Sequence, residues 1–289
     1  MGTDARGVRR RGQVYVGLAA IAWSTAGVLQ RELSVGTATQ VAGRALFAAP
    51  ALLALVVLTQ RGGALRAFAS IGRAGLIVAA STAVASGTFI VALNHTTVAN
   101  VLFMQAAAPI AAALIARVGL RESISRRSAV AMVTALGGVA LMVGGPGGAH
   151  GLGLLLSVVM TLAFALSVVT TRRRRDISMA PAVCLSQVLV LAAAAPFAHP
   201  GGVGTEDILL LVLLGVGQMG LGLALFVAGT RLIPATEVAL IMLLEVVLGP
   251  LWVLLALSER PSTTTIIGGA VVVAAVALQA GGESRVPRS

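Results

Sequence analysis

The chain has 289 residues, of which 57% are hydrophobic and 11% are charged, and its mean hydropathy is +0.97. A soluble domain of this length needs far more polar surface, so the composition excludes a soluble enzyme. The net charge of +11 comes largely from 21 basic residues, all of them arginine, which cluster in short stretches between apolar runs. A bilayer explains this distribution better than a nucleic-acid-binding face does, and no nucleic acid is expected as a partner.

Apolar stretches long enough for a membrane's hydrocarbon core, about 20 residues each, recur along the whole chain. They predict transmembrane helices at residues 14–31, 38–59, 73–93, 97–117, 128–145, 152–171, 178–197, 207–229, 234–257 and 264–281. The connections are short, so neighbouring helices should form antiparallel hairpins. The expected fold is an all-α membrane protein of ten transmembrane helices, with residues 1–289 forming a single integral membrane domain.

Arginine placement predicts the orientation of these helices. If the N-terminus is cytoplasmic, 18 arginines fall on the cytoplasmic side and two, Arg31 and Arg260, on the other side. This asymmetry fits the positive-inside rule. Arg44 alone falls inside a predicted span. We therefore expect a multi-pass protein of the bacterial inner membrane, the lipid bilayer being its first partner, with both termini cytoplasmic.

The two halves of the chain resemble each other, which indicates an internal repeat of about residues 14–145 and 152–281. The run GLRESIS at residues 119–125 aligns with ALSERPS at residues 256–262, and the same register pairs Phe89 with Phe226. Five spans per half is an odd number, so the second half must enter the membrane inverted relative to the first. Inverted repeats are typical of secondary transporters, whose substrate sites lie near the midplane between the halves.

Several stretches carry a resemblance to a known family. They are GLAAIAWST at residues 17–25, Arg44, residues 99–109 followed by Glu122, and Leu244-Glu245 followed by Glu259-Arg260. In these residues the chain resembles the drug/metabolite transporter superfamily, in its ten-helix EamA-type branch. The Trp-Ser-Thr opening is similar to that of the YddG-type aromatic amino-acid exporters within the branch. The family often has proline after the acid of the ninth helix, where this chain has Val246 and a later Pro250.

The resemblance implies a secondary transporter that exports small metabolites through a central cavity by alternating access. Aromatic or other apolar amino acids are the expected substrates. The sequence shows no metal-ligand spacing, no phosphate-binding glycine loop with lysine, and no nucleophile–base set, so no cofactor and no enzymatic activity are expected. A sugar-phosphate or nucleotide-sugar carrier, which would need several intramembrane basic residues, and a membrane enzyme or sensor are the alternatives.

Glu245 has the clearest chemistry of the candidate residues. It falls near the middle of the ninth predicted span, where an ionised acid costs roughly 2.5–3.5 kcal/mol. Acids at such a depth mark substrate or proton pathways, and desolvation disfavours their ionised form. We predict that Glu245 couples transport to protons. A structural acid that tethers helices, with uncoupled facilitation as the transport mode, is the alternative.

One helical face is marked in both halves. Glu237, Ile241 and Glu245 lie at i, i+4 and i+8, on one stripe of the ninth span. The repeat register maps these positions onto Asn100, Met104 and Ala108 of the fourth span. We predict that this face lines the central cavity and contacts substrate. Snorkelling of Glu237 to the interface and an interhelical hydrogen bond of Asn100 are the alternatives.

Aromatic residues are few, and most of them fall inside predicted spans. Phe89 and Phe226 are repeat partners, Trp23 matches Phe164, and Phe103 lies beside the marked face of the fourth span. Such rings could stack on planar apolar substrates, so we include them in the predicted substrate site. Packing against neighbouring helices or lipid is the alternative for each ring.

Arg44 stands about two turns inside the external end of the second predicted span. Its long stem could carry the charge to water, or it could form a structural ion pair. Contact with the carboxylate of a substrate is the functional alternative.

The orientation predicts the outcome of reporter fusions. A reporter fused after Ser289 should lie in the cytoplasm, and one inserted in the loop at residues 198–206 should lie outside, because the arginine asymmetry places these points on opposite sides. Compartment-specific reporters such as alkaline phosphatase and green fluorescent protein provide the measurement. If both fusions report the same side, the inverted ten-helix arrangement is wrong.

Overall fold

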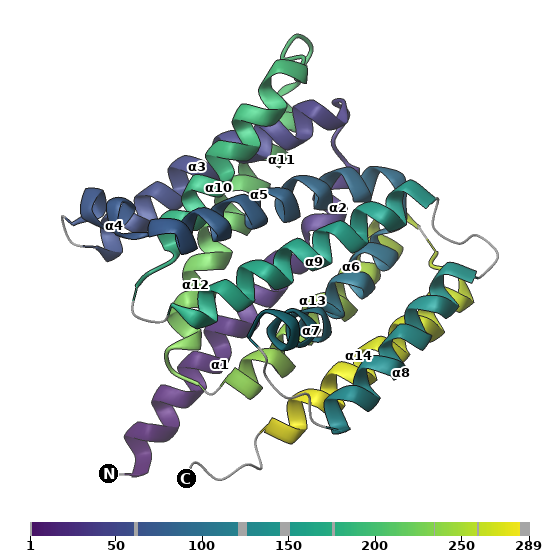
Figure 1. Cartoon of the computed structure of the whole chain (residues 1–289). Coiled ribbons are helices and arrows are strands. Elements are labelled where there is room, and N and C mark those ends of the chain that lie inside the picture. The colour runs from purple at the N-terminus through teal and green to yellow at the C-terminus, as the bar shows by residue number, and fades with distance from the viewer. Residues whose placement is uncertain are drawn as a thin grey trace.

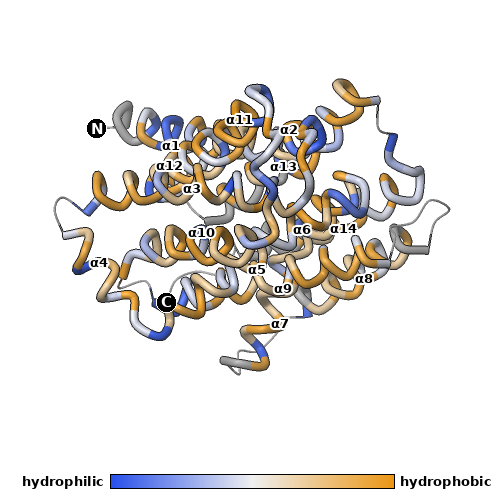
Figure 2. The backbone as a smooth tube through the Cα atoms, turned by 90° about the horizontal axis from the view of Figure 1, so that it is seen from above, coloured by the Kyte–Doolittle hydropathy of each residue, from blue (hydrophilic) through white to orange (hydrophobic). Residues whose placement is uncertain are grey.

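The computed structural model describes residues 2–60, 63–120, 126–144, 151–174, 177–233, 235–258 and 260–283 (Figure 1). These residues are helical nearly throughout and contain no β-strand. The expected all-α fold class is confirmed. Figure 2 shows that hydrophobic residues run along most of the helices.

Each of the ten ranges that the sequence predicts to be helical is helical in the described part of the structure. The first half contains α1 (Gly2–Ser24), α2 (Ala26–Arg31), α3 (Thr37–Thr59), α4 (Ala64–Ser70), α5 (Gly72–His95), α6 (Val98–Ala106), α7 (Ala108–Leu120) and α8 (Arg126–Gly144). The second half contains α9 (Gly151–Arg173), α10 (Ala180–Ala194), η1 (Ala195–Phe197), α11 (Thr205–Val212), η2 (Leu213–Leu221), α12 (Gly222–Thr230), α13 (Ala235–Leu257) and α14 (Thr263–Glu283). The short helix α4 was not predicted.

Seven helical stretches among the described residues are long and apolar enough to cross a membrane. They are Arg6–Arg31, Thr37–Thr59, Gly72–His95, Val98–Val118, Gly151–Arg173, Ala180–Phe197 and Thr205–Thr230. The three remaining predicted spans contribute shorter apolar stretches, Ala129–Leu141, Leu244–Leu257 and Thr263–Ala275. A multi-pass helical protein is therefore supported, and the number of ten spans stays a prediction.

Two predicted spans are broken near their middle or end, for local chemical reasons. The first breaks at Thr25, where the hydroxyls of Ser24 and Thr25 donate to the carbonyls of Ile21 and Ala22, each at 2.7 Å. Such back-bonding bends helices. The fourth breaks at Ala107, two residues before Pro109, which has no N–H to donate and clashes with the preceding turn.

The eighth predicted span changes its helical type in the middle. Between α11 and α12, residues Leu213–Leu221 form a π-helix, with three glycines in the sequence LLGVGQMGL. A side chain on Gly215 would place its Cβ 2.6 Å from Cβ of Phe47 and 2.8 Å from the backbone nitrogen of Ala48, so η2 lies directly against α3. π-helical turns often occur at functional sites because they re-aim side chains.

The two halves interleave in space. Figure 1 shows α5 beside α9, and α8 beside α14, each pair joining one helix of the first half to one of the second. Helix α1 likewise packs against α12 and α13. The two halves therefore pack against each other along several pairs of helices, and a single membrane domain stays a prediction.

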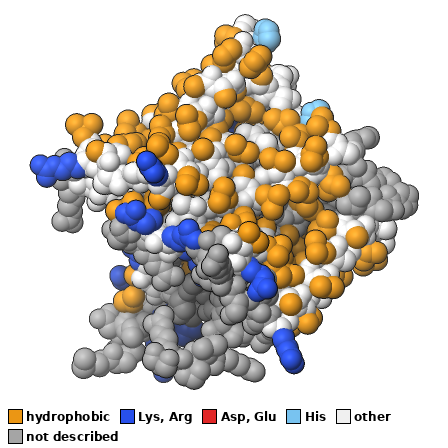
Figure 3. Space-filling view, viewed as in Figure 1, with side chains coloured by type: hydrophobic (Ala, Val, Ile, Leu, Met, Phe, Trp, Pro, Cys, Tyr) orange, Lys and Arg blue, Asp and Glu red, His pale blue; other side chains and the backbone are white. Residues whose placement is uncertain are grey.

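On the face seen in Figure 3, arginine side chains lie towards one end of the molecule. In Figure 3 they form a band from α4 towards the end that holds the start of α1 and the end of α14, while the upper right of the same face shows hydrophobic, histidine and other side chains without arginine. The far end, away from the start of α1 and the end of α14, includes the turns at residues 32–36, 95–97 and 198–204. We call it the distal end.

Glycine allows α8 and α14 to approach closely, which predicts a position-specific loss of stability. A Cβ on Gly138 would lie 2.6 Å from the backbone oxygen of Gly268, whereas a Cβ on the neighbouring Gly137 would meet nothing within 4 Å. Gly138→Val should destabilise the protein by about 1–3 kcal/mol, the usual effect of overpacking, because small residues set the distance between membrane helices.

Gly137→Val is the matched control, since it makes the same change one residue away. Thermal unfolding in detergent should show a lower midpoint for Gly138→Val and a midpoint close to wild type for Gly137→Val. Equal midpoints for the two variants would contradict the packing of α8 on α14.

Candidate functional site

Trp23 of α1 and Phe226 of α12 form an aromatic pair across the two halves. Their ring centroids are 5.2 Å apart, with planes inclined at 37°. The indole Nε1 donates to the backbone oxygen of Gln218 in η2 at 2.8 Å. A side chain on Gly222 would collide with that indole nitrogen, so a glycine is needed for the ring to lie where it does.

Gln218 holds this pair from the π-helix side. Its side-chain Nε2 donates to the backbone oxygen of Trp23 at 3.3 Å, so Trp23 and Gln218 exchange two hydrogen bonds. The remaining oxygen, Oε1, is buried without a hydrogen-bond partner among the described residues. We did not predict Gln218 from the sequence. Its signal was a lone amide within the glycine-rich run GVGQMGLG of an otherwise apolar span.

Glu245 lies in the interior of the described structure, 7% exposed. Its Oε1 accepts a hydrogen bond from Nε2 of Gln105 in α6 at 3.4 Å. No described residue forms an ion pair with it. The contact joins the ninth predicted span to the fourth, and therefore one half of the chain to the other. We did not predict Gln105, although an amide near the middle of an apolar span was visible in the sequence.

Ile241, on the same face of α13 as Glu245, connects Glu245 to the aromatic pair of Trp23 and Phe226. Ile241, one turn before Glu245, packs in one cluster with Val16 and Phe226. Gly249, one turn after Glu245, lies so close to Leu102 of α6 that any side chain there would collide with it. Helices α1, α6, α12 and α13 therefore meet around one region. We call the six residues Trp23, Gln105, Gln218, Phe226, Ile241 and Glu245 the inter-repeat site.

Other predicted site residues make contacts of their own, and their role in substrate binding stays a prediction. Asn100 is 2% exposed; it donates to Oγ1 of Thr96 at 3.0 Å and accepts from Oγ1 of Thr265 in α14 at 3.1 Å. Asn100 therefore makes an interhelical hydrogen bond, which we gave in the sequence analysis as the alternative to a contact with substrate. Phe103 of α6 packs against Gly269 of α14, where a side chain would overlap the ring.

Of three further predicted residues, the structure describes the side chains of two. Met104 is buried, and its carbonyl accepts a hydrogen bond from Thr161 of α9 at 3.1 Å. Phe164 is 42% exposed on α9. The side chain of Glu237 lies outside the described part of the structure.

Phe89 lies beneath the one arginine predicted within a span. The guanidinium carbon of Arg44 is 5.7 Å from the centroid of the Phe89 ring, a cation–π geometry. Arg44 is only 5% exposed. Most of the side chain is therefore enclosed by protein, and only a small part of it can meet water.

Hydrogen bonds tie the two halves together at the distal end. The backbone nitrogen and hydroxyl of Ser34 donate to the two carboxylate oxygens of Asp207 at 2.8 and 2.7 Å. The backbone nitrogen of His199 donates to Oγ1 of Thr39 at 3.0 Å. Arg31 donates to the backbone oxygen of Thr96 at 2.7 Å within the first half. The contacts of Ser34 and Thr39 hold the start of α3 and the turn before it against the α10–α11 connection and the first turn of α11.

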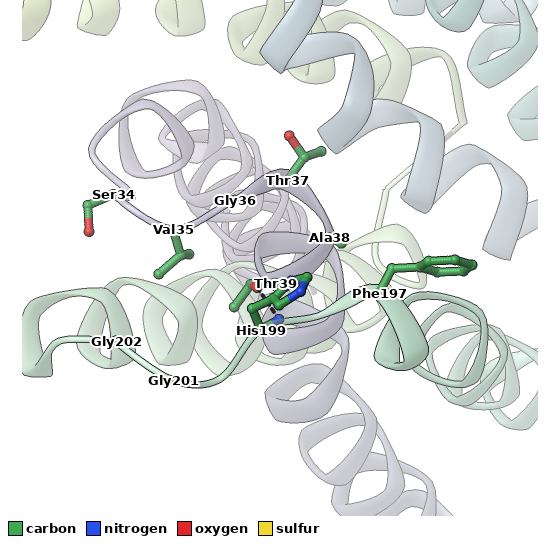
Figure 4. A pocket seen from close by; sticks show the side chains of 10 residues that line it. All are labelled: Ser34, Val35, Gly36, Thr37, Ala38, Thr39, Phe197, His199, Gly201 and Gly202. Carbon is green, nitrogen blue, oxygen red and sulfur yellow. Dashed lines mark hydrogen bonds between the residues drawn. The ribbon is translucent and has the colours of Figure 1, made fainter.

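A pocket of about 410 Å³ opens beside these contacts (Figure 4). Its lining comes from the start of α3 and from the α10–α11 connection, including Thr37, Thr39, Phe197 and His199. None of the predicted site residues lines it. The described residues also contain no group of three or more His, Cys, Asp or Glu that could hold a metal ion.

An apolar all-helical chain with polar and aromatic residues enclosed between two interleaved halves is a multi-pass membrane protein. The model of the EamA-like transporter family matches it twice, at residues 10–144 and 151–280. The chain belongs to this family, and thus to the drug/metabolite transporter superfamily. The resemblance to this superfamily that we noted in the sequence is confirmed. Assignment to the YddG-type aromatic exporters stays a prediction.

Comparison with solved structures supports the same fold. A crystal structure of another protein superposes with a TM-score of 0.68, covering 96% of this chain and 99% of that chain at 16% sequence identity. At this identity the similarity concerns the fold alone. A comparison with curated proteins finds no match.

Proposed function

We propose that the chain is a secondary transporter that exports small metabolites across the bacterial inner membrane, with aromatic or other apolar amino acids as its substrates. Family membership supports transport of a small molecule. The observation that carries the proposal is the enclosed contact of Glu245 with Gln105, because a polar pair buried between two membrane repeats is typical of a transport path.

In this proposal all ten predicted spans cross the membrane. Helices α8, α13 and α14 contain 19, 23 and 21 residues. At about 1.5 Å per residue they are roughly 28–35 Å long, enough for a hydrocarbon core of about 30 Å. An even number of crossings also agrees with Figure 1, where the start of α1 and the end of α14 lie at one end of the molecule, the end towards which the arginines in Figure 3 lie. The distal end is then external.

The inter-repeat site is the proposed place of substrate binding. Trp23 and Phe226 offer ring faces on which a planar side chain can stack, and Ile241 adds an apolar wall. Gln218 supplies an amide oxygen without a partner among the described residues. Apolar walls discriminate weakly between similar side chains, so the transporter should accept several apolar amino acids.

Alternating access requires that the distal end open and close. A neutral hydrogen bond contributes only about 0.5–1.5 kcal/mol net, and one to a charged group about 1.5–3 kcal/mol. The contacts of Ser34 with Asp207, and of Thr39 with His199, are therefore strong enough to hold the distal end shut and weak enough to break in each cycle. Their arrangement suits an external gate.

The function is tested by efflux from proteoliposomes. Purified protein is reconstituted, the vesicles are loaded with radiolabelled L-phenylalanine, and its release is compared with that from protein-free vesicles. Faster release, and competition by unlabelled tryptophan, leucine and related amino acids, is the expected result. Release at the protein-free rate for every amino acid in the panel would overturn the assignment of substrate class.

Glu245→Gln should uncouple the transporter from protons. Desolvation disfavours an ionised acid, so a carboxyl group in this position can take up a proton while enclosed and release it when water enters. Vesicles one pH unit more acidic inside should accumulate L-phenylalanine up to about tenfold through the wild-type protein, since one pH unit is worth about 1.4 kcal/mol per proton. The variant should still equilibrate L-phenylalanine but should not accumulate it.

Glu206→Gln is the matched control, because it removes an exposed acid at the start of α11. This variant should accumulate L-phenylalanine as the wild type does. Full accumulation by Glu245→Gln would assign Glu245 a structural role. No response of the wild type to the gradient would make the protein a facilitator.

A further inference from the structure

Arg44 has an arrangement that the proposed path does not explain. It lies two turns into α3, counted from Thr37, and 5% of its surface is exposed. Most of the side chain, including Nε, is therefore enclosed by protein in this conformation. A fully ionised side chain is held inside a bundle whose surroundings are mainly apolar.

No described residue neutralises this cation. Arg44 forms no hydrogen bond and no ion pair with the described residues, and its Nε is buried without a partner. Its one defined contact is the face of Phe89 at 5.7 Å. Burying a charge without a partner destabilises the folded protein by far more than a cation–π contact stabilises it. A membrane protein retains such a cation where an anion comes to it.

The surroundings of Arg44 suit a small organic anion. Phe89 packs against buried clusters of both halves, among them those of Leu93 and Val253 and of Leu211 and Leu214. Ser86, one helical turn before Phe89 on α5, has a buried hydroxyl without a partner among the described residues. A second hydrogen-bonding group is thus available near the ring over which the guanidinium lies.

The backbone next to Arg44 is also the part of the bundle with irregular geometry. A Cβ on Gly215 of η2 would lie 2.9 Å from the carbonyl oxygen of Arg44, so the π-helix is packed directly on this turn of α3. Gln218, which holds Trp23 of the inter-repeat site, belongs to the same π-helix. A movement of η2 away from α3 would therefore act on the surroundings of Arg44 and of Trp23 together.

We propose that Arg44, with Phe89 beneath it, binds the carboxylate of the transported molecule. A carboxylate provides two oxygens that match the guanidinium fork, and it compensates the charge that no described residue compensates. Phe89 packs against the apolar carbon chain next to the carboxylate. The proposal rests on the proposed transport function and adds to it a substrate class, monocarboxylates with an apolar or aromatic side chain.

The experiment compares carboxylates with their neutral amides. Thermal stabilisation of the purified full-length protein is titrated with L-phenylalanine and L-phenylalaninamide, with 3-phenylpropionate and its amide, and with hexanoate and hexanamide. In the wild type each carboxylate should bind about tenfold more tightly than its amide, because hydrogen bonds to a charged group are worth at least one order of magnitude in affinity. Arg44→Gln should abolish this preference, and Arg44→Lys should keep part of it.

Two further readouts separate binding from structure. Without ligand, Arg44→Gln should unfold at the same temperature as wild type or higher, because it removes an uncompensated buried charge. A lower midpoint together with an intact carboxylate preference would mean that Arg44 is structural, and would overturn the proposal. Arg66→Gln is the matched control; it removes an exposed arginine from α4 and should retain the carboxylate preference.

The outcomes also separate this proposal from the proposed function. Equal binding of carboxylates and amides by the wild type, with efflux of amino acids intact, would overturn the role of Arg44 and leave the function standing. Binding of 3-phenylpropionate and hexanoate that depends on Arg44, without efflux of any amino acid, would support the carboxylate site and overturn the amino-acid assignment. Stabilisation by none of the six compounds would overturn the carboxylate site.

Discussion

In a hydrocarbon core, a polar group that leaves water must find its partner within the protein, and this constraint accounts for most of the internal structure. The chain has few polar side chains in its long apolar helices, and the folded structure turns several of them inward to face each other across the two repeats. Gln105 meets Glu245, and Gln218 exchanges two hydrogen bonds with Trp23. Each of these contacts joins the first half of the chain to the second.

The same constraint explains where the backbone departs from the regular α-helix. Helix breaks at Thr25 and Ala107, and the π-helix around Gln218, occur beside these inward polar groups. Irregular backbone is tolerated at membrane depth only where protein or a water-filled cavity surrounds it. The carbonyl of Met104, next to the break at Ala107, is in fact satisfied by Thr161 of α9. The irregular segments therefore mark the interior surface along which we propose that substrate moves.

Much of the fold was predictable because hydropathy and helix length are local properties of a membrane protein. Each apolar run of about 20 residues became helical, and the family resemblance in residues 17–25 and around Glu245 proved correct at the level of the family. The pairing of side chains was less predictable. Repeat register matched Trp23 with Phe164 as equivalent positions, and it gave no indication that Trp23 contacts Phe226. Equivalent positions in two interleaved repeats need not touch, so register alone does not give contacts.

The partners of single polar residues were also not predictable from the sequence. Gln105 and Gln218 have no motif around them, and only the packing of α6 on α13 and of η2 on α1 shows what they bind. Asn100 was visible in the sequence, yet its hydrogen bonds to Thr96 and Thr265 depend on the approach of α14. Arg44 could be placed by depth, but its burial over Phe89 and its lack of a partner among the described residues needed the three-dimensional structure.

The central claim is that the two halves separate at the distal end in order to pass substrate between them. Cysteines replacing Ser34 and Asp207, whose side chains are in hydrogen-bond contact, allow the gate to be locked by oxidation once Cys184 is changed to alanine. The measurement is amino-acid flux in proteoliposomes before oxidation, after oxidation, and after reduction of the disulfide. The account predicts that flux stops on oxidation and returns on reduction, while the variant with only one of the two cysteines is unaffected. Unchanged flux through the fully cross-linked protein would contradict it.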